Sequence, residues 1–142
     1  MTDAEQTIQG FMDLLAVTGS EKVAEFMAEH GVWYTPPERP RPKGFRKMTD
    51  RRCYGNSFTV MHRGFTYVEG WAANFMGMPI HHAWVVDDEG NMIDPTWRQV
   101  GLAYYGVPFA KGFVYDMVAK GMTYGVLDKI DYSQPLPEGA IA

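Results

Sequence analysis

Two kinds of hydrophobic pattern follow one another along this 142-residue chain, and their order is the strongest constraint on its fold. Residues 8–15 and 23–27 carry apolar side chains at helical spacing. Runs of β-branched and aromatic residues, typical of strands, begin only at residue 65. Helices that precede a run of strands are typical of the α+β class with an antiparallel sheet. We therefore expect one α+β domain over residues 1–142, because the length also suits a single domain.

The first half of the chain predicts three helices. The first carries apolar residues at i, i+3, i+4 and i+7, which are Ile8, Phe11, Met12 and Leu15. The second follows Ser20, a residue type that caps the amino ends of helices. The third follows Thr49 or Asp50, either of which can serve as its N-cap. This third helix would hold Cys53 in its first turn.

The second half of the chain predicts strands at 65–71, 81–88 and 91–97. The turn signal Glu89-Gly90-Asn91 separates the last two, so they should form a hairpin that ends at Pro95. Residues 101–122 are rich in aromatic residues and glycine, and they show only a short helical stretch at 114–120. We therefore expect the cysteine-bearing helix to pack on an antiparallel sheet.

Two segments are expected to lack regular structure. Residues 35–47 (TPPERPRPKGFRK) mix prolines with basic residues and have no hydrophobic period, which predicts an extended and exposed loop. Such a loop either connects the amino-terminal helices to the next element or binds a partner. Residues 131–142 are typical of a loosely ordered terminal tail.

The composition argues against several classes of protein. The formal net charge of -4 argues against a protein that grips nucleic acid by charge. No run of about 20 apolar residues is present, so no membrane span is predicted. The single cysteine excludes an internal disulfide and a cysteine-rich zinc site. Because the first residues also lack the pattern of a secretory signal, we expect a cytoplasmic protein.

Residue types that serve nucleophilic catalysis occur in the order Cys53, His82 and Asp94. A cysteine attacks as its thiolate, and a free thiol with a pKa of about 8.5 is only a few per cent ionised at neutral pH. The first turn of a helix favours an anion, and Arg51 and Arg52 add positive charge, whereas a capping carboxylate would oppose it. An imidazole can then act as base and acid, and a carboxylate behind it fixes its tautomer. The sequence therefore suggests a catalytic triad.

Strand register decides which histidine can reach Asp94. A three-residue loop at 88–90 places Trp84 opposite Asp94 and makes His82 a diagonal neighbour on the same face. A two-residue loop at Glu89-Gly90 shifts the pairing by one residue, and His81 then shares the face of Asp94. The strand pattern alone leaves both registers open.

The stretch from Cys53 to Trp97 resembles the transglutaminase-like members of the papain-fold cysteine hydrolases. In that superfamily a cysteine opens a helix that packs on an antiparallel sheet, a histidine follows in a His-Ala-Trp setting, and an aspartate follows in an Asp-Pro-Thr setting. Here these settings read HAWVV at 82–86 and DPTW at 94–97. With YGVPF at 105–109, the chain looks similar to short bacterial or phage-encoded examples. The resemblance implies the histidine of HAWVV as the base and the aspartate of DPTW as its orienting partner.

The chain departs from the family around the cysteine. Family members often have Gly-x-Cys at this place, whereas Arg51 and Arg52 precede Cys53 here. No glutamine stands just before Cys53 to donate to an oxyanion, as it does in papain-like enzymes. The backbone N–H of Cys53 and the side-chain amide of Asn56 are therefore the candidate oxyanion donors.

The resemblance implies a thiol-dependent acyl-transfer enzyme that acts on an amide or ester, as a peptidase, a deamidase or a transglutaminase does. Its substrate would be a protein or a peptide-like amide, and no cofactor is expected. A second hypothesis is a non-catalytic binding protein that retains the fold. Its aromatic residues and the segment 35–47 would then form the contact surface.

Other residues have secondary candidate roles. His81 is expected to be structural or a substrate-side contact, and Trp84 either shields the triad, lines a pocket or packs in the core. Glu69 either enters the site as an acid or faces solvent or an arginine. No metal site is expected at Asp87 and Asp88, because the run DDEGN lacks the length and the glutamate of a calcium loop.

Overall fold

The computed structural model describes every residue from 1 to 142. The helices are α1 (Asp3–Val17), α2 (Glu21–His30), α3 (Cys53–Met61), α4 (Lys111–Gly121) and the 3₁₀ helix η1 (Leu127–Lys129). The strands are β1 (Val32–Tyr34), β2 (Thr66–Ala73), β3 (Pro79–Val86), β4 (Met92–Ile93) and β5 (Ala103–Phe109). They form one antiparallel sheet in the order β1-β5-β2-β3-β4. The predicted α+β class is confirmed.

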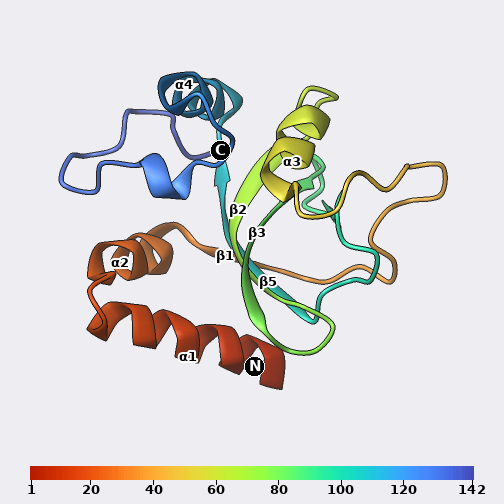
Figure 1. Cartoon of the computed structure of the whole chain (residues 1–142), viewed down its shortest axis with the longest axis horizontal. Coiled ribbons are helices and arrows are strands. Elements are labelled where there is room, and N and C mark those ends of the chain that lie inside the picture. The colour runs from red at the N-terminus through yellow and green to blue at the C-terminus, as the bar shows by residue number, and fades with distance from the viewer.

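The α-helices divide into two groups around the curled sheet (Figure 1). In this view α1 and α2 lie in the lower part of the picture, whereas α3 and α4 lie in its upper part, along the length of the strands. The long strands β2 and β3 pair along their whole length, from Thr66 opposite Val86 to Ala73 opposite Pro79. Strands β1 and β4 form the two edges. No helix in the structure has both the length and the apolar character that crossing a membrane would require.

Local sequence explains how the first two helices begin. At the amino end of α1, the Thr2 hydroxyl accepts the Glu5 N–H and the Glu5 carboxylate accepts the Thr2 N–H, which together form a capping box. Ile8 and Met12 of the predicted stripe are buried. In α2, Ser20 occupies the predicted N-cap position, but its side chain makes no capping hydrogen bond. Packing of the apolar face therefore contributes more to α2 than its cap does.

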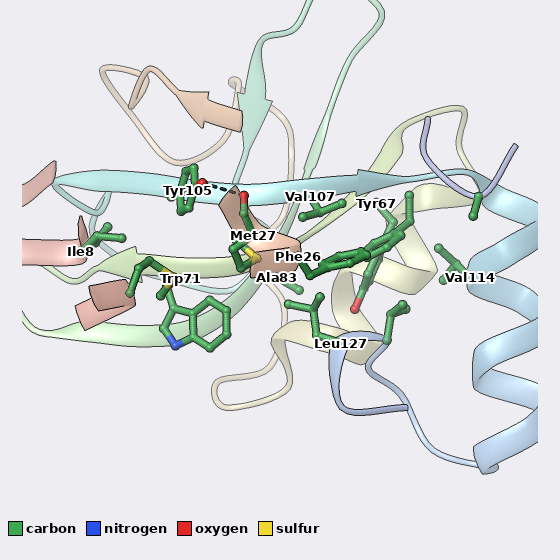
Figure 2. Close-up of a cluster of buried hydrophobic side chains, with 14 of the residues drawn as sticks. Ile8, Phe26, Met27, Tyr67, Trp71, Ala83, Tyr105, Val107, Val114 and Leu127 are labelled. Atoms are coloured by element: carbon green, nitrogen blue, oxygen red, sulfur yellow. Dashed lines mark hydrogen bonds between the residues drawn. The ribbon is translucent and has the colours of Figure 1, made fainter. Parts of the chain in front are cut away.

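The main hydrophobic core lies between one face of the sheet and the helices α1, α2 and α4 (Figure 2). Its members drawn there include Ile8, Phe26 and Met27 from the amino-terminal helices and Tyr67, Trp71 and Val107 from the strands. The Tyr105 hydroxyl donates to the Met27 carbonyl at 2.7 Å, so α2 is also tied to β5 by a polar contact. Full burial of one large apolar side chain contributes about 1.5–3 kcal/mol, so this cluster makes a larger hydrophobic contribution than the two smaller clusters.

The opposite face of the sheet carries a smaller cluster built around Trp84 and Tyr104. A side chain at Gly106 could not be accommodated there, because its Cβ would lie 2.8 Å from both the Trp84 ring and Val68. The absence of a side chain at Gly106 therefore allows the Trp84 ring to pack against the backbone of β5. That ring forms one wall of the site described below.

Two of the predicted strands are confirmed by β2 and β3, and the third is much shorter than predicted. β4 contains only Met92 and Ile93, because the Asp94 N–H leaves the ladder and donates to the Pro40 carbonyl at 2.9 Å. After residue 100 the chain forms β5 and α4, and α4 begins at Lys111 rather than near residue 114.

Residues 35–47 contain no helix or strand, as predicted, and they run beside the loop that carries Asp94. In addition to the contact of Pro40, Arg41 donates to the Asp94 carbonyl at 2.7 Å and to the Trp97 carbonyl at 2.8 Å. The segment therefore connects β1 to α3 and also braces the Asp94 loop.

The carboxyl end of the chain is held by β5, although the sequence predicted a loosely ordered tail. Ile141 forms a bridge with Phe109, and the Ala142 N–H donates to the Pro108 carbonyl at 3.0 Å. Ala140 is buried. Contacts of one or two residues leave no periodic pattern in a sequence, which explains why this pairing was not predicted.

Candidate functional site

The hairpin between β3 and β4 sets the register at the site. The Asp87 N–H donates to the Asn91 carbonyl at 2.9 Å, so the connecting loop consists of residues 88–90. This is the first of the two registers that the sequence left open. It places His82 and Asp94 on the same face of the hairpin, as diagonal neighbours.

His82 and Asp94 form a buried hydrogen-bonded pair. Nε2 of His82 lies 2.8 Å from Oδ2 of Asp94, and the two side chains are 1% and 0% exposed. The other oxygen of Asp94, Oδ1, accepts the N–H groups of Thr96 and Trp97 at 3.0 Å each. The Tyr104 hydroxyl donates to Oδ2 at 3.0 Å. Hydrogen bonds on both oxygens therefore hold the Asp94 carboxylate in one orientation toward His82.

Aromatic rings enclose the imidazole of His82. The Trp97 indole stacks on it with ring centroids 3.9 Å apart and an interplanar angle of 15°. Trp84 lies farther away at 6.0 Å, is fully buried and leaves its Nε1 without a hydrogen-bond partner. Trp84 therefore packs in the core behind the imidazole, and Trp97 fixes the plane of the ring and shields it from water.

Cys53 is the first residue of α3, and its side chain is half-buried. Arg52 occupies the N-cap position and makes no side-chain capping bond. The N–H of Cys53 has no partner within the helix, because the first turn of an α-helix leaves its N–H groups free. The sulfur thus lies at the end of the helix that favours an anion.

The prediction that Thr49 or Asp50 caps α3 is wrong. Asp50 pairs instead with Lys47, whose Nζ lies 2.6 Å from Oδ1. Arg51 has a φ of 63°, a left-handed conformation that turns the chain between Asp50 and the helix. The carboxylate that would have opposed a thiolate is therefore neutralised by a lysine rather than bound to the helix end.

Electrostatic interactions join the three candidate residues. Burial disfavours the charged imidazole of His82, but the charge and hydrogen bond of Asp94 and the hydrogen bond of Cys53 outweigh it and raise the pKa of His82 to about 9. Burial also opposes the charge of Asp94, yet His82 and the N–H groups of Trp97 and Thr96 hold its pKa below the usual value. The raised pKa favours the cationic form of His82, which hydrogen-bonds Asp94 at 2.8 Å and interacts with Cys53.

Asn56 lacks the free amide donor that an oxyanion would need. Its Nδ2 donates to the Thr49 carbonyl at 2.8 Å and to Oγ1 of Thr96 at 2.9 Å. Both amide hydrogens are thus engaged, which contradicts the expected oxyanion role of Asn56. The residue instead ties α3 to the loop that carries Asp94.

His81 points to the opposite face of the sheet from His82, because neighbouring strand residues alternate. It stacks on Trp71 with ring centroids 4.7 Å apart, and its side chain is 33% exposed. Its Nε2 lies 3.2 Å from Oε2 of Glu69, but the two atoms are not aligned as a hydrogen bond. The structure therefore does not bring His81 to Asp94.

Glu69 is fully buried, although the sequence favoured a carboxylate facing solvent or an arginine. It accepts the Tyr67 hydroxyl at 2.5 Å and the N–H groups of Val126 and Leu127 at 2.8 and 2.9 Å. These partners fasten the chain before η1 to the centre of the sheet. Because they come from distant parts of the sequence, the strand pattern around Glu69 did not reveal them.

Three residues of the site were missed by the sequence reasoning. The Tyr104 hydroxyl donates to the Asp94 carboxylate, and the Thr96 hydroxyl accepts the side-chain amide of Asn56. Arg41 donates to the backbone carbonyl of Asp94. The aromatic and β-branched residues of AYYGVPF at 103–109 could have revealed β5 and hence Tyr104 as a residue of the sheet. No local signal distinguishes Arg41 from the other basic residues of its segment.

Two grooves flank the amino end of α3. One has a volume of about 680 Å³ and includes Arg51, Ile80 and Trp97 in its lining. The other, of about 350 Å³, includes Arg51, Arg52 and Tyr124. The first adjoins the buried pair, because Trp97 stacks on the imidazole and Ile80 precedes it by two residues on β3. No group of three or more histidine, cysteine or acidic side chains could hold a metal ion.

Comparison of the chain with models of protein families, with curated proteins and with solved structures gave no match. Any assignment of function therefore depends on the geometry of the site.

Proposed function

We propose that this protein is a thiol-dependent acyl-transfer enzyme in which Cys53 is the nucleophile, His82 the acid and base, and Asp94 the group that orients His82. One observation carries the proposal: the buried imidazole of His82 hydrogen-bonds Asp94 at 2.8 Å, and Asp94 and Cys53 together raise its pKa to about 9. A cationic imidazole beside a thiol favours the thiolate, which is the reactive form of cysteine. The place of Cys53 at the start of α3 acts in the same direction.

The first half of the reaction forms an acyl-enzyme. The Cys53 thiolate adds to the carbonyl carbon of an amide or ester, and the carbonyl electron pair moves to oxygen. The Cys53 N–H can donate to that oxyanion. When the bond to the leaving group breaks, the proton of His82 that faces the sulfur moves to the departing nitrogen or oxygen. A thioester on Cys53 and a neutral His82 remain.

The second half restores the enzyme. His82 takes a proton from water or from an amine, which then adds to the thioester carbon. The carbon–sulfur bond breaks, and Cys53 leaves as the thiolate beside a cationic His82. Water yields hydrolysis or deamidation, and an amine yields a new amide, as in transglutaminase-like enzymes. Throughout both halves Asp94 keeps Nε2 of His82 in place, so the other ring nitrogen faces the reaction.

The test is the rate at which iodoacetamide alkylates Cys53 at pH 6, measured by mass spectrometry against glutathione as a free thiol. We expect Cys53 to react at least tenfold faster, because a free thiol is almost wholly protonated at that pH. His82→Gln should remove the advantage. His62→Gln, at the exposed opposite end of α3, is the matched control and should keep it. A rate for Cys53 equal to that of glutathione would refute the proposal.

The alternative function is a non-catalytic binding protein that retains this fold. It is favoured by exposed apolar side chains at the turn between β2 and β3, where Phe75 and Met76 are 57% and 65% exposed. The enzymatic function requires the sulfur of Cys53, whereas the binding function does not. If Cys53→Ala leaves the biological effect of the protein intact while the fold is kept, the binding function stands and the enzymatic one does not.

A further inference from the structure

The groove next to the His82–Asp94 pair is electropositive, although the chain as a whole has a net charge of -4. Arg51 and Arg98 line this groove, Arg51 and Arg52 line the second one, and no aspartate or glutamate lines either. Asp50, which precedes Arg51 in the chain, is paired with Lys47 at 2.6 Å. After Lys47, the charges of Arg98 and Arg51 also lower the pKa of Asp50. The positive charges of Arg51 and Arg98 therefore lie close enough together to affect the same carboxylate.

The same groove also offers apolar contact area. Phe75, Ile80 and Trp97 line it together with the two arginines. Phe75 stands on the turn between β2 and β3, which is held in shape by Asn74, whose Oδ1 accepts the N–H groups of Met76 and Met78 at 3.0 Å each. An ordered turn that exposes apolar side chains is suited to contact with a partner.

From this charge and shape we propose that the groove binds the acyl donor, and that the donor is a peptide segment with a carboxylate side chain beside an apolar or aromatic one. The inference rests on the proposed function: Arg51 of the groove lies two residues before Cys53, so a segment bound there would lie near the start of α3 for acyl transfer. Arg51 and Arg98 would pair with the carboxylate, and Phe75, Ile80 and Trp97 would contact the apolar side chain. The guanidinium groups suit a carboxylate because each can donate two parallel hydrogen bonds.

The first experiment compares alkylation of Cys53 by iodoacetate, an anion, and by iodoacetamide, its neutral analogue of nearly equal size. The quantity measured is the ratio of the two rates at pH 7 and low ionic strength. We expect Arg51→Gln and Arg98→Gln each to lower this ratio about threefold, because each removes one positive charge near the sulfur. Arg63→Gln removes the same charge beyond the opposite end of α3 and should leave the ratio unchanged.

The second experiment measures how well short peptides protect Cys53 from iodoacetamide. We expect N-acetyl-Phe-Glu-amide to protect better than both N-acetyl-Phe-Gln-amide and N-acetyl-Gly-Glu-amide. The preference for glutamate should disappear in the Arg51→Gln, Arg98→Gln double variant. Equal protection by all three peptides would overturn the inference.

The results separate this inference from the proposed function. If iodoacetamide alkylates Cys53 no faster than a free thiol, the proposed function fails and the inference fails with it. Alkylation of Cys53 can be fast while the ratio of the iodoacetate and iodoacetamide rates stays the same in the Arg51→Gln and Arg98→Gln variants. In that case the preference for an acidic donor is refuted and the enzymatic proposal stands. If the ratio of the two rates also falls in the Arg63→Gln control, the change comes from the net charge of the protein. The arginines of the groove are then not its specific cause, and the inference is refuted.

Discussion

Two adjacent histidines of β3 each lie near a buried carboxylate, on opposite faces of the sheet, and their surroundings differ in a way that bears on function. Asp94 and Glu69 have similar partners, since each accepts two backbone N–H groups and one tyrosine hydroxyl. The histidines differ: His82 makes an aligned hydrogen bond of 2.8 Å to Asp94, whereas His81 lies 3.2 Å from Glu69 without alignment.

The distribution of the hydrogen bonds on each carboxylate matters more than their number. Asp94 receives both backbone donors on Oδ1, so Oδ2 is left for His82 and Tyr104. Glu69 receives one backbone donor on each oxygen and thereby fastens the chain near η1 to β2. The first arrangement orients an imidazole, and the second secures a loop. Only His82 also interacts with a thiol, that of Cys53, which helps to raise its pKa.

Among the changes that would distinguish the roles of Asp94 and Glu69, we expect Glu69→Ala to have the largest effect on stability. It leaves the Val126 and Leu127 N–H groups and the Tyr67 hydroxyl without an acceptor, at about 1–3 kcal/mol each. We expect a loss of about 4 kcal/mol in the free energy of unfolding, measured with urea. Glu69→Gln, which keeps an acceptor oxygen, should lose less. The rate of alkylation of Cys53 in the folded variants should stay within about twofold of the wild-type rate. A much lower rate would contradict a purely structural role for Glu69.

The second effect is a pH dependence of stability that belongs to His82 alone. Its pKa is raised from 6.5 to about 9, so its contribution to stability is complete below pH 6.5 and is lost as the pH rises through 9. The change should be on the order of 3 kcal/mol. Urea midpoints between pH 6 and pH 10 measure it. His81→Gln should keep this loss, whereas His82→Gln should not show it; the same profile in both variants would show that the assignment to His82 is wrong.

The third effect compares the same two variants in reactivity. His82→Gln should slow alkylation of Cys53 by iodoacetamide at pH 6 about tenfold or more, because a thiol without a neighbouring imidazolium is almost wholly protonated at that pH. His81→Gln should change the rate less than threefold, since its ring stacks on Trp71 and has no contact with Asp94. Equal losses in the two variants would remove the distinction between the two histidines.

The smallest effect compares the two tyrosines. Tyr104→Phe removes one hydrogen bond to Asp94 and the acceptor of the Gly101 N–H, which should cost about 1 kcal/mol of stability and slow alkylation of Cys53 a few-fold. Tyr67→Phe removes the matching bond to Glu69 and should cost similar stability with no change in alkylation. Thermal unfolding and alkylation of both variants test this difference, and a slower rate in Tyr67→Phe would count against it.

Several features of the site could be predicted from the sequence, and the reasons differ from one feature to another. The strands that carry His82 and Glu69 follow from β-branched and aromatic runs, and a helix with Cys53 in its first turn was also predicted. The cap of that helix could not be predicted, because the left-handed turn at Arg51 has no signature such as glycine. The role of Arg41 depends on contacts across more than fifty residues, which no local pattern records.

Local periodicity and composition were enough to predict the α+β class, the helices α1 to α3, the strands β2 and β3, and the residue types available for chemistry. Only the tertiary structure decided that His82, rather than His81, meets Asp94, since a shift of one residue in the hairpin exchanges the two faces. It also decided that Asn56 supports a loop and that Glu69 is buried. Those outcomes depend on which distant donors reach each side chain when the sheet and helices pack together.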